Sequence, residues 1–289
     1  MLIKRILSGV IFVPIVAILV WWHPISFLAL VCVITTLILI EFYQLAELIG
    51  ANRKTKSSVS EANIFKSLGI VLCLFFPLAA YISNRDVTLS FLTETFIYLS
   101  IVVSFVYQVV KRDTTSALLT ISAFFMGIIY AGWAFGRYLV LIRDMKIDNM
   151  EIGVGLIFLF IAIIWCGDTG AYAIGRLLGR HKLIPAISPG KTIEGAMGGL
   201  FFGILGGIAI KYVFLPKVIA LHHIIILGIL LGIIGQIGDL GESLLKRNAN
   251  MKDSGNLIPG HGGVLDRCDS MILTAPVFYY YLKYLLHIV

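Results

Sequence analysis

The polar stretch from Asp239 to Asp269 differs from the strongly apolar sequence on both sides of it. It reads DLGESLLKRNANMKDSGNLIPGHGGVLDRCD and concentrates acids, bases, one histidine and a Gly-Gly pair between two apolar runs. Charge packed this densely at the boundary of a membrane is most simply explained by a functional site. We therefore interpret this stretch as the centre of a binding or catalytic site.

The acidic residues of this stretch are spaced so that they can face one another. One helical face, at positions i, i+3, i+4 and i+7, carries Asp239, Glu242, Ser243 and Lys246. Asp266 and Asp269, in the next segment, are again three positions apart. Clustered carboxylates need a cation to remain charged together, and oxygen-rich clusters suit Mg²⁺ with phosphate oxygens completing its shell. The spacing predicts such a site, although an Asp239–Lys246 ion pair would explain part of it as structure.

A glycine-rich turn, GHGG at 260–263, precedes the last apolar segment. Glycine lets backbone N–H groups approach an anion, and the N-terminus of a helix attracts one. The polar segments also contain strong bases, namely Lys191, Lys246, Arg247, Lys252 and Arg267. With these bases present, phosphate binding by His261, Gly262 and Gly263 is favoured over a structural role for the histidine.

A second polar block, SPGKTIEG at 188–195, has the same character. Its first three residues are predicted to form a turn and the next two to open a helix. The P-loop spacing GxxxxGK[ST] fails, since Pro185 occupies the place of its first glycine and no strand is predicted before it. An ordinary P-loop is therefore excluded. A lysine and a hydroxyl group at a helix start can still bind phosphate, which makes candidates of Ser188, Lys191, Thr192 and Glu194.

A third block, CGDTGAYAIGRLLGRHKL at 166–183, places Asp168 inside an apolar span. Arg176 and Arg180 follow about two and three helical turns later. The sequence leaves two roles open for Asp168, a salt bridge to a neighbouring helix and a contact with substrate.

These motifs resemble the signature of the phosphatidate cytidylyltransferase (CDP-diacylglycerol synthase) family. The pattern S-x-x-K-R-x4-K-D-x-G-x2-I-P-x-H-G-G-x2-D-R-x-D runs from Ser243 to Asp269, and the two upstream blocks resemble that family's other motifs. The resemblance covers residues 165–270, while the first half of the chain agrees only in hydropathy. Cys268 departs from the pattern, because the family usually has an aliphatic residue or threonine there.

The resemblance implies that CTP and phosphatidic acid react to give CDP-diacylglycerol and pyrophosphate. It also implies a helical bundle, a homodimer, and a divalent metal ion, taken as Mg²⁺, held by Asp239 and Asp266. The further catalytic candidates are Lys246, Arg247, Lys252 and Arg267. Asp253, His261 and Asp269 belong to the site without a defined role. The sequence leaves open whether a second, monovalent cation binds.

Two other functions fit part of the same inventory. A CTP-dependent lipid kinase would use similar residues but release CDP instead of pyrophosphate. An ion-coupled transporter could use the acids, but transporters often carry broken helices in both halves. Here the polar blocks lie only in the second half, which favours an enzyme.

The composition identifies the structural class that must position these residues. The chain has 289 residues, of which 59% are hydrophobic and only 13% charged, whereas about a quarter of the residues in a soluble domain are charged. We predict an all-α, multi-pass membrane protein, with no nucleic-acid partner despite its net charge of +7. Nine apolar segments are predicted, at 5–22 (a retained first helix), 25–48, 66–82, 91–110, 116–141, 154–178, 192–214, 222–245 and 268–288.

The distribution of lysine and arginine predicts the orientation. With the N-terminus in the cytoplasm, most of these residues fall in cytoplasmic loops, as the positive-inside rule requires. The outside loops then hold only Arg85, Arg143, Lys146 and Lys217. We expect an inner (cytoplasmic) membrane protein with its C-terminus outside and all three polar blocks facing the cytoplasm.

The two halves of the chain are expected to differ in role. Residues 1–150 are predicted to form a scaffold of about five helices, and residues 151–289 about four helices that carry the motifs. In the first half, Glu41, Gln44 and Glu47 are interpreted as an interfacial polar face rather than a substrate contact. In the second half, glycines at every fourth position predict close helix packing, namely Gly195, Gly199, Gly203 and Gly207, with Gly228 and Gly232 in the next span.

Overall fold

Helices make up almost all of the computed structural model, which describes residues 13–52, 59–83, 91–112, 117–147, 150–255 and 262–288. The predicted all-α class is confirmed, and the chain is a polytopic membrane protein. Among the described residues, seven helices are long and apolar enough to span a bilayer: Pro24–Gly50, Phe65–Ser83, Leu92–Lys111, Ala117–Arg143, Gly153–Leu178, Ile193–Phe214 and Leu221–Asn248.

These seven helices correspond to the second to eighth predicted segments. The first predicted segment lies partly outside the described residues, and its described part is a shorter apolar helix, Val13–Trp22. The last one is a helix, α10 (Leu265–Leu285), but it is not among the seven apolar spans. The predicted count of nine spans is therefore not confirmed.

The chain forms two compact units, residues 1–141 with 245–268 and residues 142–244 with 269–289. The boundary passes through α9 (Leu221–Asn248) and α10, so the polar stretch contributes residues to both units. The predicted division of the chain near residue 150, into a scaffold and a part that carries the motifs, concerns the roles of the two halves. It remains a prediction.

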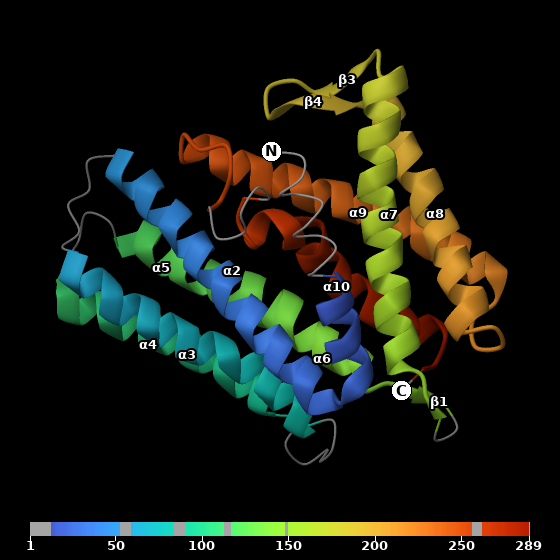
Figure 1. The fold of residues 1–289 in the computed structure, drawn as a ribbon. Coiled ribbons are helices and arrows are strands. Elements are labelled where there is room, and N and C mark those ends of the chain that lie inside the picture. The colour runs from blue at the N-terminus through green and yellow to red at the C-terminus, as the bar shows by residue number, and fades with distance from the viewer. Residues whose placement is uncertain are drawn as a thin grey trace. The chain divides into compact units, whose positions relative to one another are not determined.

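In the first unit, α2 (Pro24–Asn52) packs against α3 (Val59–Ser83) and against the helix that begins with α5 (Ala117–Gly127). Aromatic rings fill the space between them. The Tyr43 hydroxyl donates to the Phe124 carbonyl oxygen at 3.1 Å, and the Phe65 and Phe124 rings lie 4.2 Å apart between centroids. Figure 1 shows α2, α3 and α4 (Leu92–Lys111) as neighbouring rods.

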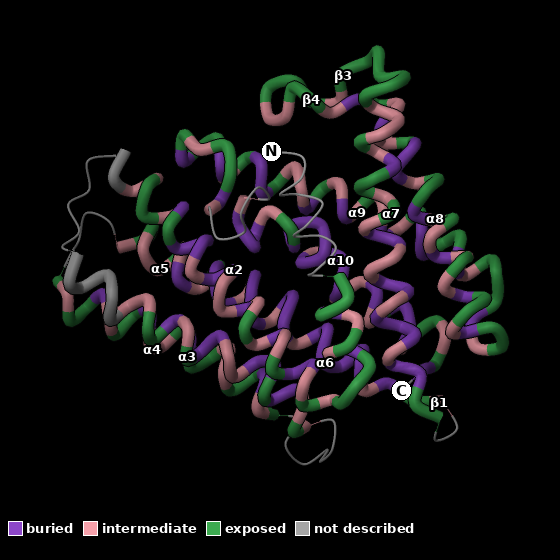
Figure 2. Tube along the Cα trace, viewed as in Figure 1, coloured by how far each residue is buried: buried purple, intermediate pink, exposed green. Residues whose placement is uncertain are grey.

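Helix α4 has the inside-out pattern of a membrane helix. Its buried side chains are polar, namely Thr93, Ser100, Ser104 and Gln108. Its most exposed ones are apolar or aromatic, namely Tyr98, Val109 and Val110, each more than two thirds exposed. Figure 2 colours the chain by burial, with buried, intermediate and exposed segments alternating along the helices. Apolar side chains face lipid, and small polar ones allow close packing between helices.

The span predicted at 116–141 is a single helical rod with an unusual centre. Between α5 and α6 (Tyr138–Arg143) the backbone forms a π-helix, η2 (Ile128–Arg137). Such segments are rare and are usually single turns. Two glycines bring η2 close to its neighbours, since a Cβ atom at Gly132 would lie 2.8 Å from the Cys73 carbonyl oxygen and one at Gly136 would lie 2.8 Å from Thr35 Oγ1.

The second unit contains a long helix pair, α7 (Gly153–Leu178) and α8 (Ile193–Phe214), joined by a β-hairpin. Strands β3 (Lys182–Ile184) and β4 (Ser188–Thr192) pair antiparallel, and Figure 1 shows them at one end of the helices. A second short hairpin joins β1 (Lys146–Ile147) and β2 (Met150–Glu151). The prediction of a turn at 188–190 without a preceding strand was wrong, because both arms of this connection pair their backbones. The antiparallel hairpin is still no P-loop.

The predicted glycine ridge is confirmed as a packing surface between α7 and α8. A Cβ atom at Gly195, Gly203 or Gly206 would lie 2.8 to 2.9 Å from a carbonyl oxygen of α7. The partners on α7 run from Ala171 back to Ala162 as the α8 glycines advance, so the helices are antiparallel. Gly228 and Gly232 extend the pattern by bringing α9 against Ile204 and Leu200 of α8.

This packing predicts that two identical substitutions on neighbouring helices have different effects. Gly203→Ala puts a methyl group 2.9 Å from the Ile163 carbonyl oxygen, whereas Gly241→Ala on α9 meets nothing within 4 Å. We expect Gly203→Ala to destabilise the protein by about 1–3 kcal/mol, because the helices must separate. Gly241→Ala should be neutral or slightly stabilising, because alanine is the better helix former. The midpoint of thermal unfolding in detergent measures both effects, and equal midpoints would contradict the role of the ridge.

Candidate active site

The first unit holds Asp266 in a set of strong interactions at the start of α10. Its Oδ1 atom accepts from Lys246 Nζ at 2.6 Å. Its Oδ2 atom accepts from the backbone N–H groups of Ser254 at 2.9 Å and Gly263 at 2.8 Å. The side chains of Lys246 and Asp266 are only 11% and 7% exposed. The carboxylate predicted to bind a metal ion is therefore held rigidly by Lys246 and by the loop before α10. The described residues of this loop, 249–255 and 262–264, are called the Asp266 loop.

These contacts determine the protonation state of Asp266. Burial raises the pKa of this carboxyl group, but the Lys246 hydrogen bond and charge and the two backbone N–H groups outweigh burial and lower the pKa below its usual value. A lowered pKa contributes stability above the pKa of an unfolded aspartate, about 3.9, and loses it as the pH falls through the folded-state value. Asp266 is thus an anion at neutral pH.

A second carboxylate, Glu41 from α2, reaches the same loop. It accepts from Ser254 Oγ at 2.9 Å and from the backbone N–H groups of Val264 at 3.0 Å and Leu265 at 2.8 Å. Glu41 is 5% exposed. The interpretation of Glu41 as part of an interfacial polar face was therefore wrong, although Gln44 and Glu47 are exposed as expected.

The Gly-Gly pair is required by these two carboxylates. Gly262 has a φ of +84°, and a Cβ atom there would lie 2.9 Å from Asp266 Oδ2. A Cβ atom at Gly263 would collide with Ser254 Oγ and Glu41 Oε2. Backbone donors near an anion were predicted for this turn. In this structure the anions that they contact belong to the protein itself, and phosphate binding by the pair remains a prediction.

The remaining predicted residues of the first unit lie on the surface. Arg247, Lys252, Asp253 and Arg267 are exposed. Arg247 donates to the Met251 carbonyl oxygen at 3.1 Å, which closes the end of α9. His261 lies outside the described residues. The structure thus places four charged side chains around the Asp266 loop, where solutes can reach them.

In the second unit, the β3–β4 hairpin brings Lys191 to Asp239. The Lys191 Nζ atom lies 2.7 Å from Asp239 Oδ2, and the two side chains are 25% and 33% exposed. Two blocks that are far apart in the sequence therefore meet, as the phosphate-site hypothesis requires. The alternative ion pair between Asp239 and Lys246 would join the two units and remains a prediction.

Two residues predicted to bind phosphate have structural contacts at the start of α8, and phosphate binding by them remains a prediction. Thr192 is the N-cap of α8, with its hydroxyl oxygen accepting from the Gly195 N–H at 3.1 Å. Glu194 accepts from the backbone N–H groups of Arg180 and His181, and its Oε1 atom lies 2.6 Å from His181 Nδ1. Ser188 is paired with Ile184 in the hairpin. These contacts fix the position of Lys191 between two anchored ends.

Four carboxylates of the second unit interact electrostatically: Asp168 of α7, Asp239 and Glu242 of α9, and Asp269 of α10. Glu242 and Asp269 are buried, and Ser243 beside them is buried as well. Gly238 permits this approach, since a Cβ atom there would lie 2.6 Å from the Asp269 carbonyl oxygen. The predicted face of α9 and the predicted partner acid on α10 are therefore brought together.

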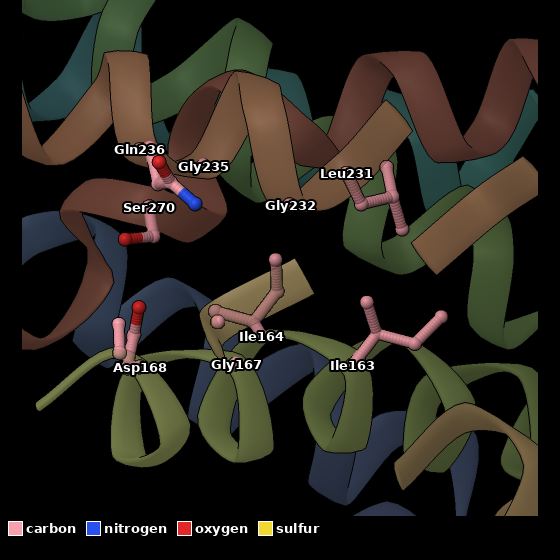
Figure 3. Close-up of a pocket in the computed structure, with 11 residues that line it drawn as sticks. Ile163, Ile164, Gly167, Asp168, Leu231, Gly232, Gly235, Gln236 and Ser270 are labelled. Carbon is pink, nitrogen blue, oxygen red and sulfur yellow. The ribbon is translucent and has the colours of Figure 1, made fainter. Parts of the chain in front are cut away.

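A small cavity of about 20 Å³ lies beside these acids, between α7, α8, α9 and α10. This volume is enough for about one water molecule. Figure 3 shows Asp168, Gln236 and Ser270 at one end of the cavity and apolar side chains at the other. Gln236, which donates to the Ala196 carbonyl oxygen at 3.1 Å, was missed in the sequence. The sequence feature that could have identified it is a single amide side chain in an apolar run, one helical turn before Asp239.

The donor set suits a hard cation such as Mg²⁺, because carboxylate oxygens are its preferred protein ligands. In the described part of the chain, however, no three histidine, cysteine, aspartate or glutamate side chains are arranged as ligands of one ion. Lysine ammonium groups are the cations that Asp239 and Asp266 contact here. The predicted sharing of one metal ion by Asp239 and Asp266 joins the two units and remains a prediction.

Comparisons with known proteins bear on this site. The profile of a family described as the cytidylyltransferase family matches residues 3–285. Phosphatidate cytidylyltransferase of Staphylococcus saprophyticus is 36% identical over 240 residues, 83% of this chain and 85% of that protein. The enzyme of the same name from Staphylococcus haemolyticus is 35% identical over 221 residues, 76% and 78% of the two chains. The uncharacterised protein YnbB of Escherichia coli is 38% identical over 177 residues, 61% of this chain and 58% of YnbB.

The Lys246–Asp266 pair should contribute far more to stability than the exposed Lys66–Glu47 pair, whose side chains are 24% and 43% exposed. We expect Lys246→Met to destabilise the protein by about 3–5 kcal/mol, because it leaves a buried carboxylate without its cation. The matched substitution Lys66→Met should change stability by no more than about 1 kcal/mol. Thermal unfolding of both variants in the same detergent measures the difference. Similar midpoints would mean that the Asp266 loop does not need its lysine.

Proposed function

We propose that this chain, which belongs to the cytidylyltransferase family, transfers CMP from CTP to phosphatidic acid and thereby forms CDP-diacylglycerol and pyrophosphate. The observation that carries the proposal is the pairing of both predicted metal-binding aspartates with lysines, Asp239 with Lys191 and Asp266 with Lys246. A site that binds a triphosphate together with a lipid phosphate needs positive charge beside fixed metal-binding carboxylates. Two of the relatives, those from the Staphylococcus species, are named phosphatidate cytidylyltransferases.

The reaction is a displacement at the α-phosphorus of CTP. A phosphate oxygen of phosphatidic acid forms the new P–O bond, the bond between the α-phosphorus and the bridging oxygen breaks, and pyrophosphate leaves with the electron pair. The attacking oxygen is already anionic near neutral pH, so no strong general base is needed. The chief obstacle is repulsion between the two anions.

The residues of the site act on that repulsion. Asp239 and Asp266 would hold Mg²⁺, which when bound supplies charge neutralisation at the reacting phosphates. Lys191 and Lys246, carried by the hairpin and by the end of α9, would orient the triphosphate. Arg247, Lys252 and Arg267 are exposed around the Asp266 loop and add positive charge for the incoming nucleotide.

We place the site at the cytoplasmic face of the inner membrane, where water-soluble CTP can meet a lipid whose tails stay in the bilayer. The apolar spans and the distribution of lysine and arginine support this orientation. We also infer a homodimer, by resemblance to the family. Light scattering of the detergent-solubilised protein tests that inference.

Labelled substrates test the reaction and separate it from its rival. With CTP labelled in the α-phosphate, wild-type protein should transfer the label to phosphatidic acid, release pyrophosphate, lose activity in EDTA and recover it with Mg²⁺. Asp239→Ala and Asp266→Ala should each lower the rate at least a hundredfold, because each removes a metal-binding carboxylate. The matched substitution Glu47→Ala, on the surface of α2, should leave the rate unchanged.

A CTP-dependent lipid kinase would give the opposite labelling pattern. It would transfer label from the γ-phosphate to diacylglycerol and release CDP. That pattern would exclude the proposed reaction, and full activity of both aspartate variants would exclude their proposed role as metal ligands.

The proposed orientation predicts which loops are accessible from each side. In a background without native cysteines, Lys217→Cys, between α8 and α9, should react with a membrane-impermeant maleimide in intact cells. Asn250→Cys, in the Asp266 loop, should react only after the membrane is permeabilised. Both residues are exposed, so a failure to label reports the membrane and not burial. Labelling in the reverse order would place the site outside.

A further inference from the structure

Glu41 is a buried acid that the proposed chemistry does not use. It lies in α2, far from the signature motifs in sequence, yet all of its recorded hydrogen bonds go to the loop and helix start that carry Asp266. A carboxylate inside an apolar helix bundle is strongly unfavourable unless hydrogen bonds or charges compensate it. Glu41 therefore has a specific task in this part of the protein.

The contacts identify that task. The first N–H groups of a helix lack partners within the helix, and an anion near them is stabilising. Glu41 Oε1 and Oε2 accept from the N–H groups of Val264 and Leu265, at the start of α10. Glu41 thus supplies the N-terminal cap of α10 from another helix.

The same loop residues bind both Glu41 and Asp266. Ser254 donates its hydroxyl group to Glu41 and its backbone N–H to Asp266. The neighbouring N–H groups of Gly263 and Val264 are divided in the same way, the first to Asp266 and the second to Glu41. Any displacement of Glu41 must therefore move the donors that orient Asp266.

Glycines make room for the Glu41 carboxylate on both sides. A Cβ atom at Gly255 would lie 2.7 Å from Glu41 Oε1, and one at Gly263 would collide with Glu41 Oε2. Two glycines of the signature stretch thus serve a residue outside it. This arrangement is more specific than the filling of a gap in the core.

We propose that Glu41 is a positioning residue for the cytidylyltransferase reaction, one that holds the Asp266 carboxylate in place by tying Ser254, Val264 and Leu265 to α2. The catalytic role of Glu41 rests on the proposed function. The attachment of the loop to α2 rests on the hydrogen bonds alone. It assigns a role in the active site to the N-terminal half of the chain.

Glu41→Gln tests the proposal, with Glu47→Gln as its matched control on the same helix, where Glu47 pairs with Lys66 at the surface. We expect Glu41→Gln to raise amide hydrogen exchange at 262–268 at least tenfold in protein without substrate. We also expect kcat to fall at least tenfold with little change in KM for CTP, and the Mg²⁺ concentration for half-maximal activity to rise. Glu47→Gln should change none of these quantities.

Two results would overturn the proposal. One is wild-type exchange and turnover in Glu41→Gln. The other is exchange that rises equally along α2 and α3, because Glu41 would then support the fold as a whole. Should Glu41→Gln fail to fold, Ser254→Ala removes only the hydroxyl bond to Glu41. It should raise exchange at 262–268 about threefold, and unchanged exchange would again overturn the proposal.

The same experiment separates this proposal from the proposed function. If wild-type protein forms no CDP-diacylglycerol, the proposed function fails. The exchange measurement needs no substrate, so it still decides whether Glu41 holds the loop.

Discussion

The need to satisfy buried carboxylates governs the polar part of this membrane protein. A carboxylate among apolar helices is tolerated only with charged or hydrogen-bonded partners. Asp266 has one lysine and two backbone N–H groups, and Glu41 has one hydroxyl and two backbone N–H groups. The described parts of the loop before α10, residues 249–255 and 262–264, are therefore shaped around two carboxylates. Its glycines, its serine and the first residues of α10 all follow from that requirement.

In the second unit, close packing of the apolar helices fixes the positions of the polar residues. Glycines along α8 bring it against the backbone of α7, and the hairpin continues from the ends of both helices. Gly179 lies under Thr192, since a Cβ atom there would be 2.7 Å from Thr192 Oγ1. A lysine on such an anchored hairpin has few alternative positions. The close packing of α7 against α8 therefore also fixes where Lys191 meets Asp239.

Local patterns in the sequence were sufficient for much of this structure. Hydropathy located seven spans, because a bilayer imposes length and composition on each helix separately. The four-residue glycine period predicted close helix packing, which the structure shows between α7 and α8, since helical geometry places those residues on one face. The spacing of Asp239, Glu242 and Ser243 predicted a shared helical face for the same reason, and α9 is helical through all three.

Contacts between distant segments were not predictable in this way. Glu41 looked like one acid of an interfacial face, because no local pattern connects it to a loop more than two hundred residues away. The β3–β4 hairpin was missed because its strands are short and carry turn-forming residues. Spacing also could not reveal that each of the two predicted metal-binding aspartates, Asp239 and Asp266, contacts a lysine. Such pairings depend on tertiary packing, and no fixed spacing of residues along a single sequence indicates them.

The two lysine–carboxylate pairs have a consequence for the proposed reaction. In each pair the carboxylate is neutralised by a side chain that is itself a phosphate ligand by chemistry. Under the proposed function, Asp239 and Asp266 would hold the metal ion, and Lys191 and Lys246 would then be available to the triphosphate. The residues that would hold the metal ion thus also keep the positive charge needed by the substrate in the site. An arrangement of this kind keeps buried charges compensated before the nucleotide arrives and makes the exchange of partners part of substrate binding.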